Sequence, residues 1–138
     1  MNRIIAIALL ALSGVVSGGS ALAQEHGVRA TIPFDFAIGN NVLPAGHYQI
    51  VVQDHNLVQV RNRDYGTTSW VVALPGDLGG GNDGKLLFDK YGDQYFLISA
   101  SSSSANLSIV IPPSRMEKQL RDREARVSTP ERTLIALK

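Results

Sequence analysis

The sequence predicts a mainly β protein: an antiparallel β-sandwich or small barrel of about seven to eight strands, with one C-terminal helix after an N-terminal signal peptide. Three observations lead to this prediction. Short segments rich in Val, Ile, Phe and Tyr follow one another between turn-forming residues. The segment Lys85–Ser99 has the pattern of a hairpin with apolar side chains on both faces. After Pro112-Pro113 the β pattern ends and a helix-capping pattern begins.

The N-terminal segment, residues 1–23, has the three parts of a secretory signal peptide. Arg3 gives a positive start, Ile4–Val16 is a largely apolar run, and Ala21-Leu22-Ala23 has the small-x-small form of a cleavage site. The uninterrupted apolar stretch is shorter than the roughly 18–20 residues that a membrane span needs. We therefore expect a mature chain that starts near Gln24, is exported to the periplasm or beyond, and has no membrane span.

Composition restricts the class of protein further. The chain has no cysteine, so an exported domain of this sequence must be stabilised by packing without disulfides. Its 13 Lys and Arg are balanced by 12 Asp and Glu. The C-terminal residues 114–138 are mildly basic but mixed in sign, which is typical of a solvated helix. We therefore expect no nucleic-acid partner.

Residues 24–113 are expected to form the β domain. Val28–Ile38 alternates apolar and polar residues, which predicts one long strand with one buried face, and Pro33 places this strand at an edge or bends it. Residues 47–53 and 57–61 form a hairpin pattern, residues 67–74 a further strand, and residues 107–111 a short strand stopped by Pro112.

The central hairpin turns at Gly92-Asp93. A two-residue loop with Gly first is typical of a type II′ turn, in which Gly92 has a positive φ. This register places Lys90 opposite Tyr95 and Phe88 opposite Leu97. Large apolar groups then lie on both faces, so the hairpin is expected in the middle of the domain.

Residues 114–138 are expected to hold a helix and a closing strand. Ser114 and Glu117 have the spacing of a capping box, so a helix should run from Arg115 to about Arg126. Its apolar stripe is sparse, which predicts a helix lying on the domain surface. Thr133–Leu137 is a candidate closing strand.

The motifs resemble an uncharacterised family of small exported β-domain proteins associated with Acidobacteria. The matching residues are Ile32–Phe36, Leu43–Gly46 with Tyr48, Leu87-Phe88, Tyr91–Asp93, Tyr95–Leu97, and Ser114 with Glu117. The resemblance implies an exported β domain and brings no activity, cofactor or catalytic residue. The chain departs from the family at Ser101–Ala105, where the family has a bulkier, aromatic-containing hairpin extension.

Two motifs suggest ligands and are weak. Gly79–Lys85 fits the GxxxxGK pattern of a phosphate-binding loop, but Leu86 stands where Ser or Thr is needed, and a strand follows instead of a helix. A simple connecting loop explains these glycines better. Side-chain oxygens of Asp77, Asn82, Asp83 and Asp89 could act as Ca²⁺ ligands, but their spacing does not match an EF-hand. The sequence does not decide whether this loop binds calcium.

The catalytic residue types are scattered. His47 and His55 lie at opposite ends of one predicted strand, too far apart for one metal ion, and His26 lies near the new N-terminus. Asp35 and Asp89 lie among aromatic residues, where paired carboxylates would suit glycoside hydrolysis, but sequence does not give their separation.

Two function classes follow from these observations. The favoured one is an exported, non-catalytic β domain without cofactor or metal, which binds an envelope protein or polysaccharide. Amphipathic rings suit such a surface, and the candidates are Tyr48, Trp70, Tyr91 and Tyr95. The alternative is a small secreted or periplasmic hydrolase whose site is not visible in the sequence.

Overall fold

The structure is a computed structural model that describes residues 27–54, 56–77, 84–126 and 130–137. The expected signal peptide, His26, His55 and the glycine-rich stretch with Asn82 and Asp83 lie outside the described residues. The elements, in chain order, are β1 Gly27–Ile32, β2 Phe36–Ile38, β3 Asn41–Leu43, β4 Gly46–Val52, β5 Leu57–Asn62, β6 Thr68–Val72, β7 Leu74–Pro75, β8 Lys85–Tyr91, β9 Gln94–Ser102, β10 Leu107–Val110, α1 Arg115–Glu124 and β11 Glu131–Ala136.

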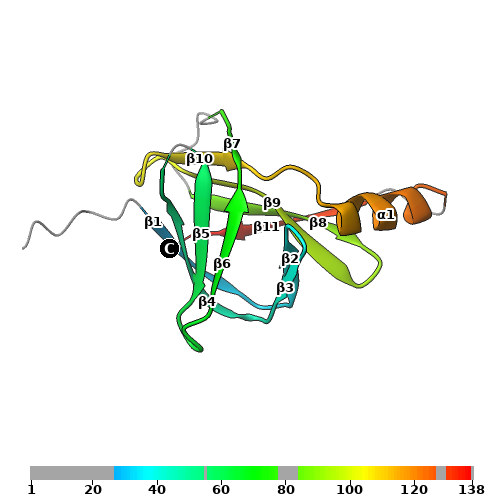
Figure 1. The fold of residues 1–138 in the computed structure, drawn as a ribbon, viewed down its shortest axis with the longest axis horizontal. Helices are drawn as coiled ribbons and strands as arrows, with labels where there is room; N and C mark the ends of the chain where they lie inside the picture. Colours follow the sequence, from blue (N-terminus) through cyan, green and yellow to red (C-terminus); the bar gives the residue numbers. More distant parts are fainter. Residues whose placement is uncertain (1–26, 55, 78–83, 127–129, 138) are drawn as a thin grey trace, which may run out of the picture.

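Two sheets make up the domain (Figure 1), which confirms the predicted all-β class. One sheet has four strands in the order β1-β4-β5-β6. The other has seven, in the order β11-β8-β9-β10-β7, with β2 paired to β9 and β3 paired to β2. All pairings are antiparallel except that of β2 with β9. The short strands β2, β3 and β7 raise the strand count above the seven or eight expected from sequence.

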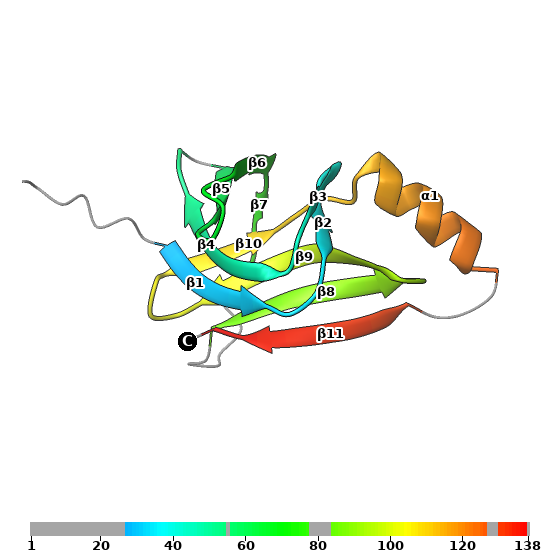
Figure 2. The ribbon, with the colours of Figure 1, turned by 90° about the horizontal axis from the view of Figure 1, so that it is seen from below.

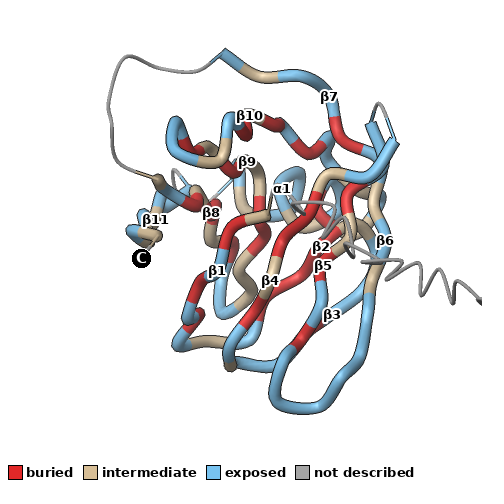
Figure 3. Tube along the Cα trace, turned by 90° about the vertical axis from the view of Figure 1, so that its left-hand side faces the viewer, coloured by how far each residue is buried: buried red, intermediate tan, exposed pale blue. Residues whose placement is uncertain are grey.

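The core lies between the inner faces of the two sheets. The alternation in β1 points Val28, Ala30 and Ile32 inward, and these side chains are buried. They share one cluster with the inner residues of the other strands, including Ile50, Val58, Val60, Leu86, Phe88 and Leu97. Figure 3 shows buried positions alternating with intermediate or exposed ones along β1 and β5. Removal of this apolar surface from water is the main favourable contribution to folding in a chain without cysteine.

The predicted long strand over residues 28–38 is broken in two. β1 ends at Ile32 in one sheet, and β2 starts at Phe36 in the other. Pro33 cannot donate to a ladder, and the Asp35 carboxylate accepts a hydrogen bond from the Ala45 backbone N–H at 2.9 Å. The bend predicted at Pro33 is therefore the point where the chain passes between the sheets.

The central hairpin of β8 and β9 has the predicted register. Lys90 lies opposite Tyr95 and Phe88 opposite Leu97. Gly92 has a φ of +60°, whereas Asp93 is not among the residues with positive φ, as a type II′ turn requires. A register irregularity between Leu87 and Phe88 interrupts the ladder.

The helix and the last strand attach residues 114–138 to the β domain. Ser114 Oγ accepts a hydrogen bond from the Glu117 backbone N–H at 3.1 Å, which confirms the predicted cap. Met116 and Leu120 pack on the outer side of the hairpin, against Tyr91 and Phe96. Figure 2 shows α1 beside the turn end of β8 and β9, and β11 returning along β8 as the predicted closing strand. In the described part of the chain, α1 does not have the length and hydropathy of a membrane span.

Candidate binding surface

Two of the four aromatic residues expected at a binding surface are buried. Tyr48 points inward from β4, is 1% exposed, and donates its hydroxyl to the Pro44 carbonyl. Its ring packs edge-on against Phe36, with centroids 5.1 Å apart. Tyr91 is 4% exposed because α1 covers it. The expectation that Tyr48 and Tyr91 belong to a surface is wrong, because one faces the core and the other lies under the helix.

Tyr95 and Trp70 have different surroundings. The Tyr95 ring is half-buried and stacks on Phe34, with centroids 3.9 Å apart and planes 15° apart. The Lys90 ammonium lies 5.4 Å from the centroid of the Tyr95 ring. Both neighbours reduce the ring area that a partner can reach. Trp70, by contrast, is 49% exposed on the outer side of β6.

Trp70 belongs to a group of exposed apolar side chains that we call the apolar strip. Trp70, Val72 and Leu74 alternate along the path from β6 into β7, and the residue between the last two, Ala73, is buried. Leu57 on β5 lies opposite Val72, and Val110 on β10 lies opposite Leu74. Because residues directly opposite each other in a ladder share a face, the strip continues across both sheets. It consists of Leu57, Trp70, Val72, Leu74 and Val110.

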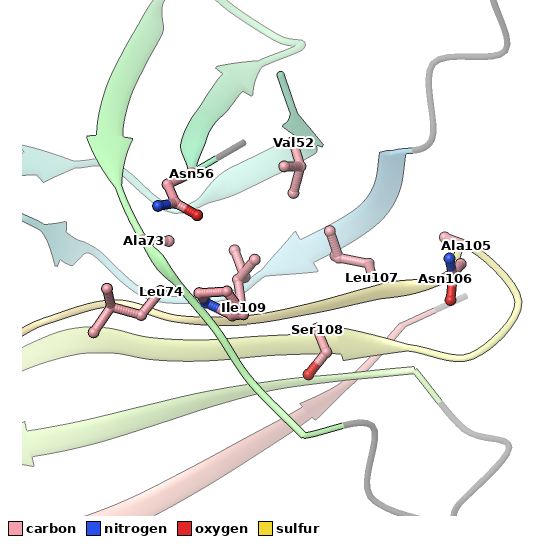
Figure 4. A pocket seen from close by; sticks show the side chains of 10 residues that line it. Val52, Asn56, Ala73, Leu74, Ala105, Asn106, Leu107, Ser108 and Ile109 are labelled. Atoms are coloured by element: carbon pink, nitrogen blue, oxygen red, sulfur yellow. The ribbon is translucent and has the colours of Figure 1, made fainter. Parts of the chain in front are cut away.

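A small hollow lies beside the apolar strip (Figure 4). It has a volume of about 160 Å³ and lies between β10 and the chain that joins β6 to β7. Its lining is mainly apolar and includes Val52, Ala73, Leu74, Leu107 and Ile109. The volume is below the roughly 300–1,000 Å³ of small-molecule sites. It suits a single apolar side chain of a partner.

The strip also runs along a sheet edge. β6 is the last strand of the four-stranded sheet and pairs only with β5 among the described strands. An edge strand presents unpaired N–H and C=O groups that another polypeptide can use. Apolar side chains and free backbone groups therefore lie next to each other.

Asp35 and Asp89, the carboxylates considered for a catalytic pair, have separate hydrogen-bond partners. Asp35 accepts the Ala45 N–H, and Asp89 accepts a hydrogen bond from Arg132 Nε at 3.1 Å. Asp89 instead lies near Glu117, which is 6% exposed. Burial, followed by the Asp89 charge, raises the pKa of Glu117 above its ordinary value. Among the residues that the structure describes, no group of three His, Cys, Asp or Glu could hold a metal ion.

The structure brings together one pair of catalytic residue types, His47 and Asp64, whose contact was not predicted from the sequence. His47 Nδ1 lies 3.0 Å from Asp64 Oδ1, and both side chains are well exposed. The turn that positions Asp64 is built by buried Asn62, whose Oδ1 accepts the backbone N–H groups of Asp64 and Tyr65 at 2.8 and 3.0 Å. An Asn followed two residues later by Asp, then by Gly66, is a turn signal, but nothing in the sequence ties this turn to His47.

Comparison with models of protein families, with curated proteins and with solved structures gives no match for this chain.

Proposed function

We propose that this protein is an exported, non-catalytic binding domain that holds a protein of the cell envelope on the apolar strip. The observation that carries the proposal is the row of exposed apolar side chains, Trp70, Val72 and Leu74, beside a hollow of side-chain size. Contiguous exposed apolar groups of this kind mark interaction surfaces. Export is inferred from the signal-peptide pattern of residues 1–23.

A protein partner fits the strip better than a polysaccharide. Affinity at protein interfaces is concentrated in a few aromatic and apolar anchors that fill pockets. Trp70 is such an aromatic anchor, and the hollow is a pocket that an anchor of the partner can fill. The free edge of β6 can additionally pair with an extended segment of the partner. An extended neutral polysaccharide is typically held on several aromatic faces with hydrogen-bonding groups between them. The strip instead offers one aromatic ring among aliphatic side chains.

The alternative of a small hydrolase has less support. The His47 and Asp64 pair provides two parts of a catalytic triad. The hydrogen bonds found for the His47 ring within the described residues go to Asp64, and no nucleophile is bonded to it. Water also reaches both side chains, whereas catalytic electrostatics gain strength when water is excluded.

The proposal is tested by site-specific photocrosslinking in envelope extract. A benzoyl-phenylalanine placed at Val72 should trap a discrete protein. That protein, purified and mixed with the wild-type domain, should bind directly. Trp70→Ala and Val72→Asp should weaken this binding at least about tenfold, since interface anchors contribute 2 kcal/mol or more.

Tyr65→Ala is the matched control, because Tyr65 is an aromatic residue 72% exposed in the β5–β6 turn, outside the strip. Equal losses with Tyr65→Ala and Trp70→Ala would contradict the proposal. So would crosslinks only to a second copy of the chain, or hydrolysis of an ester or glycoside that His47→Ala abolishes. Export is checked separately: the intact mass of the exported protein should correspond to a chain starting near Gln24.

A further inference from the structure

A second, larger hollow lies at the β1 edge of the four-stranded sheet, away from the part of the apolar strip that follows its β6 edge. Its volume is about 330 Å³, within the range of small-ligand sites. It lies on β1 and β4, and Ala136 at the end of β11 closes it from the other sheet. Its lining includes the polar residues Arg29, Thr31, His47 and Arg63, together with Tyr48, whose hydroxyl already donates to the Pro44 carbonyl.

Strand register explains why these groups meet. Thr31 on β1 lies directly opposite His47 on β4. The Arg63 backbone N–H donates to the His47 carbonyl at 2.8 Å, which places Arg63 on the other side of His47. Arg29 is two residues before Thr31 on β1, so the two side chains share the exposed face of the strand.

The charge of this hollow is positive. The strands β1, β4, β5 and β6 contain no acidic residue. The Asp64 carboxylate is outside the lining, accepts the backbone N–H of His47 and faces its ring. Arg29 forms no salt bridge with a described residue. Arg63 also forms no salt bridge with a described residue, although its charge contributes to the lowered pKa of Asp64. Both guanidinium groups can therefore bind an anion from outside the chain.

We infer that this hollow binds an acidic sugar, with the anionic group held by Arg29 and Arg63. Guanidinium groups bind carboxylate and phosphate oxygens through paired, charge-assisted hydrogen bonds. The Thr31 hydroxyl both donates and accepts, so it can bond a sugar hydroxyl. A bare ion would leave most of a 330 Å³ hollow empty, whereas a monosaccharide can fill it. Nucleic acid is disfavoured, because its binding needs many cationic contacts and this chain has a formal net charge of only +1.

The inference is tested on the whole protein by following backbone amide shifts in NMR titrations. The probes are glucuronate, glucose 6-phosphate and glucose. The two acidic sugars separate a carboxylate from a phosphate as the preferred group, and glucose is the uncharged control. At least one acidic sugar should shift the amides of Arg29, Thr31, His47 and Arg63 and bind at least about tenfold more tightly than glucose, as expected for hydrogen bonds to a charged group.

Substitutions make the test specific to the hollow. Arg29→Gln and Arg63→Gln should each weaken binding of the acidic sugar. Arg61→Gln should not, because Arg61 is an exposed arginine of the same sheet outside the lining. Trp70→Ala should leave the titration unchanged, so this result is independent of the proposed protein partner. Well-dispersed spectra of the free variants establish that each is folded.

Three results would overturn the inference: equal affinity for glucose and both acidic sugars, including no binding by any of them; equal effects of Arg61→Gln and Arg29→Gln; or shifts confined to other strands. Tighter binding of a short oligothymidylate than of either sugar at the same salt concentration would assign the hollow to nucleic acid instead.

Discussion

The carboxylate of Asp64 accepts hydrogen bonds from both the backbone N–H and the ring Nδ1 of His47, at 2.8 and 3.0 Å. These bonds connect the β5–β6 turn to the start of β4. They favour the charged carboxylate, and the backbone bond is the larger cause of the lowered pKa of Asp64. In a ¹³C NMR titration, Asp64 should therefore have a pKa below the ordinary Asp value of 3.8.

His47→Ala separates the two bonds, since it removes the ring and keeps the backbone N–H. The part of the lowering of the Asp64 pKa that comes from the backbone bond, its largest single cause, should survive in this variant. A return to the ordinary value would show that the ring, and not the backbone, is the main cause. Because the folded pKa lies below the unfolded one, the contribution of Asp64 to stability is present above the ordinary Asp pKa and is lost as pH falls through the folded value.

The pKa of Glu117 is shifted in the opposite direction from that of Asp64. Burial, and then the neighbouring Asp89, raise its pKa, so its ionisation opposes folding. Glu117→Gln should increase the free energy of unfolding at neutral pH, because Gln keeps an acceptor for the Ser114 N–H without the buried charge. Urea unfolding should show a gain that is complete above the raised pKa of Glu117 and shrinks to nothing as pH falls to the ordinary value of 4.5.

The matched control for this variant is Asp122→Asn, which removes one negative charge from an exposed position of the same helix. Asp122→Asn should leave the free energy of unfolding almost unchanged both at neutral pH and near the ordinary Glu pKa of 4.5. If Glu117→Gln is destabilising at neutral pH, the carboxylate is stabilised by its surroundings and the raised pKa is wrong.

The hairpin register, the helix cap and the closing strand could be predicted because each depends on local sequence. Gly92 fixes the turn, and the spacing of Ser114 and Glu117 fixes the helix start. The break after Ile32 was predicted only as an edge position or a bend at Pro33. Pro33 removes a hydrogen-bond donor, but this does not determine which sheet the following residues join.

The surface could not be predicted to the same extent. Alternation placed Trp70 and Val72 on one face of a strand, but whether that face meets the core or solvent depends on sheet order. The same ambiguity led to the wrong expectation for Tyr48, which lies on the inner face of β4. Tyr91 was misplaced for another reason: the helix that covers it is 24 or more residues later in the chain.

The Ser114 cap gives a test of how firmly α1 is attached. Ser114→Ala removes the acceptor for the Glu117 N–H and should lower helix stability by about 1 kcal/mol. Hydrogen exchange of the Glu117 and Lys118 amides should become faster. Ser114→Asp keeps an acceptor and should preserve protection. Equal exchange rates in the wild-type and Ser114→Ala proteins would mean that packing by Met116 and Leu120 alone holds the first turn.

Gly92 provides the sharpest test of the central hairpin. Its φ of +60° lies in the left-handed region, which costs a β-branched residue at least about 1 kcal/mol. A Cβ at this position would also approach Glu124 Oε1 at 2.8 Å, but that carboxylate is the end of a flexible side chain. Gly92→Val should therefore lower the free energy of unfolding in urea, whereas Gly92→Asn, which meets Glu124 equally but tolerates positive φ, should lower it less. Equal losses in the two variants would assign the effect to Glu124 and not to the backbone of the turn.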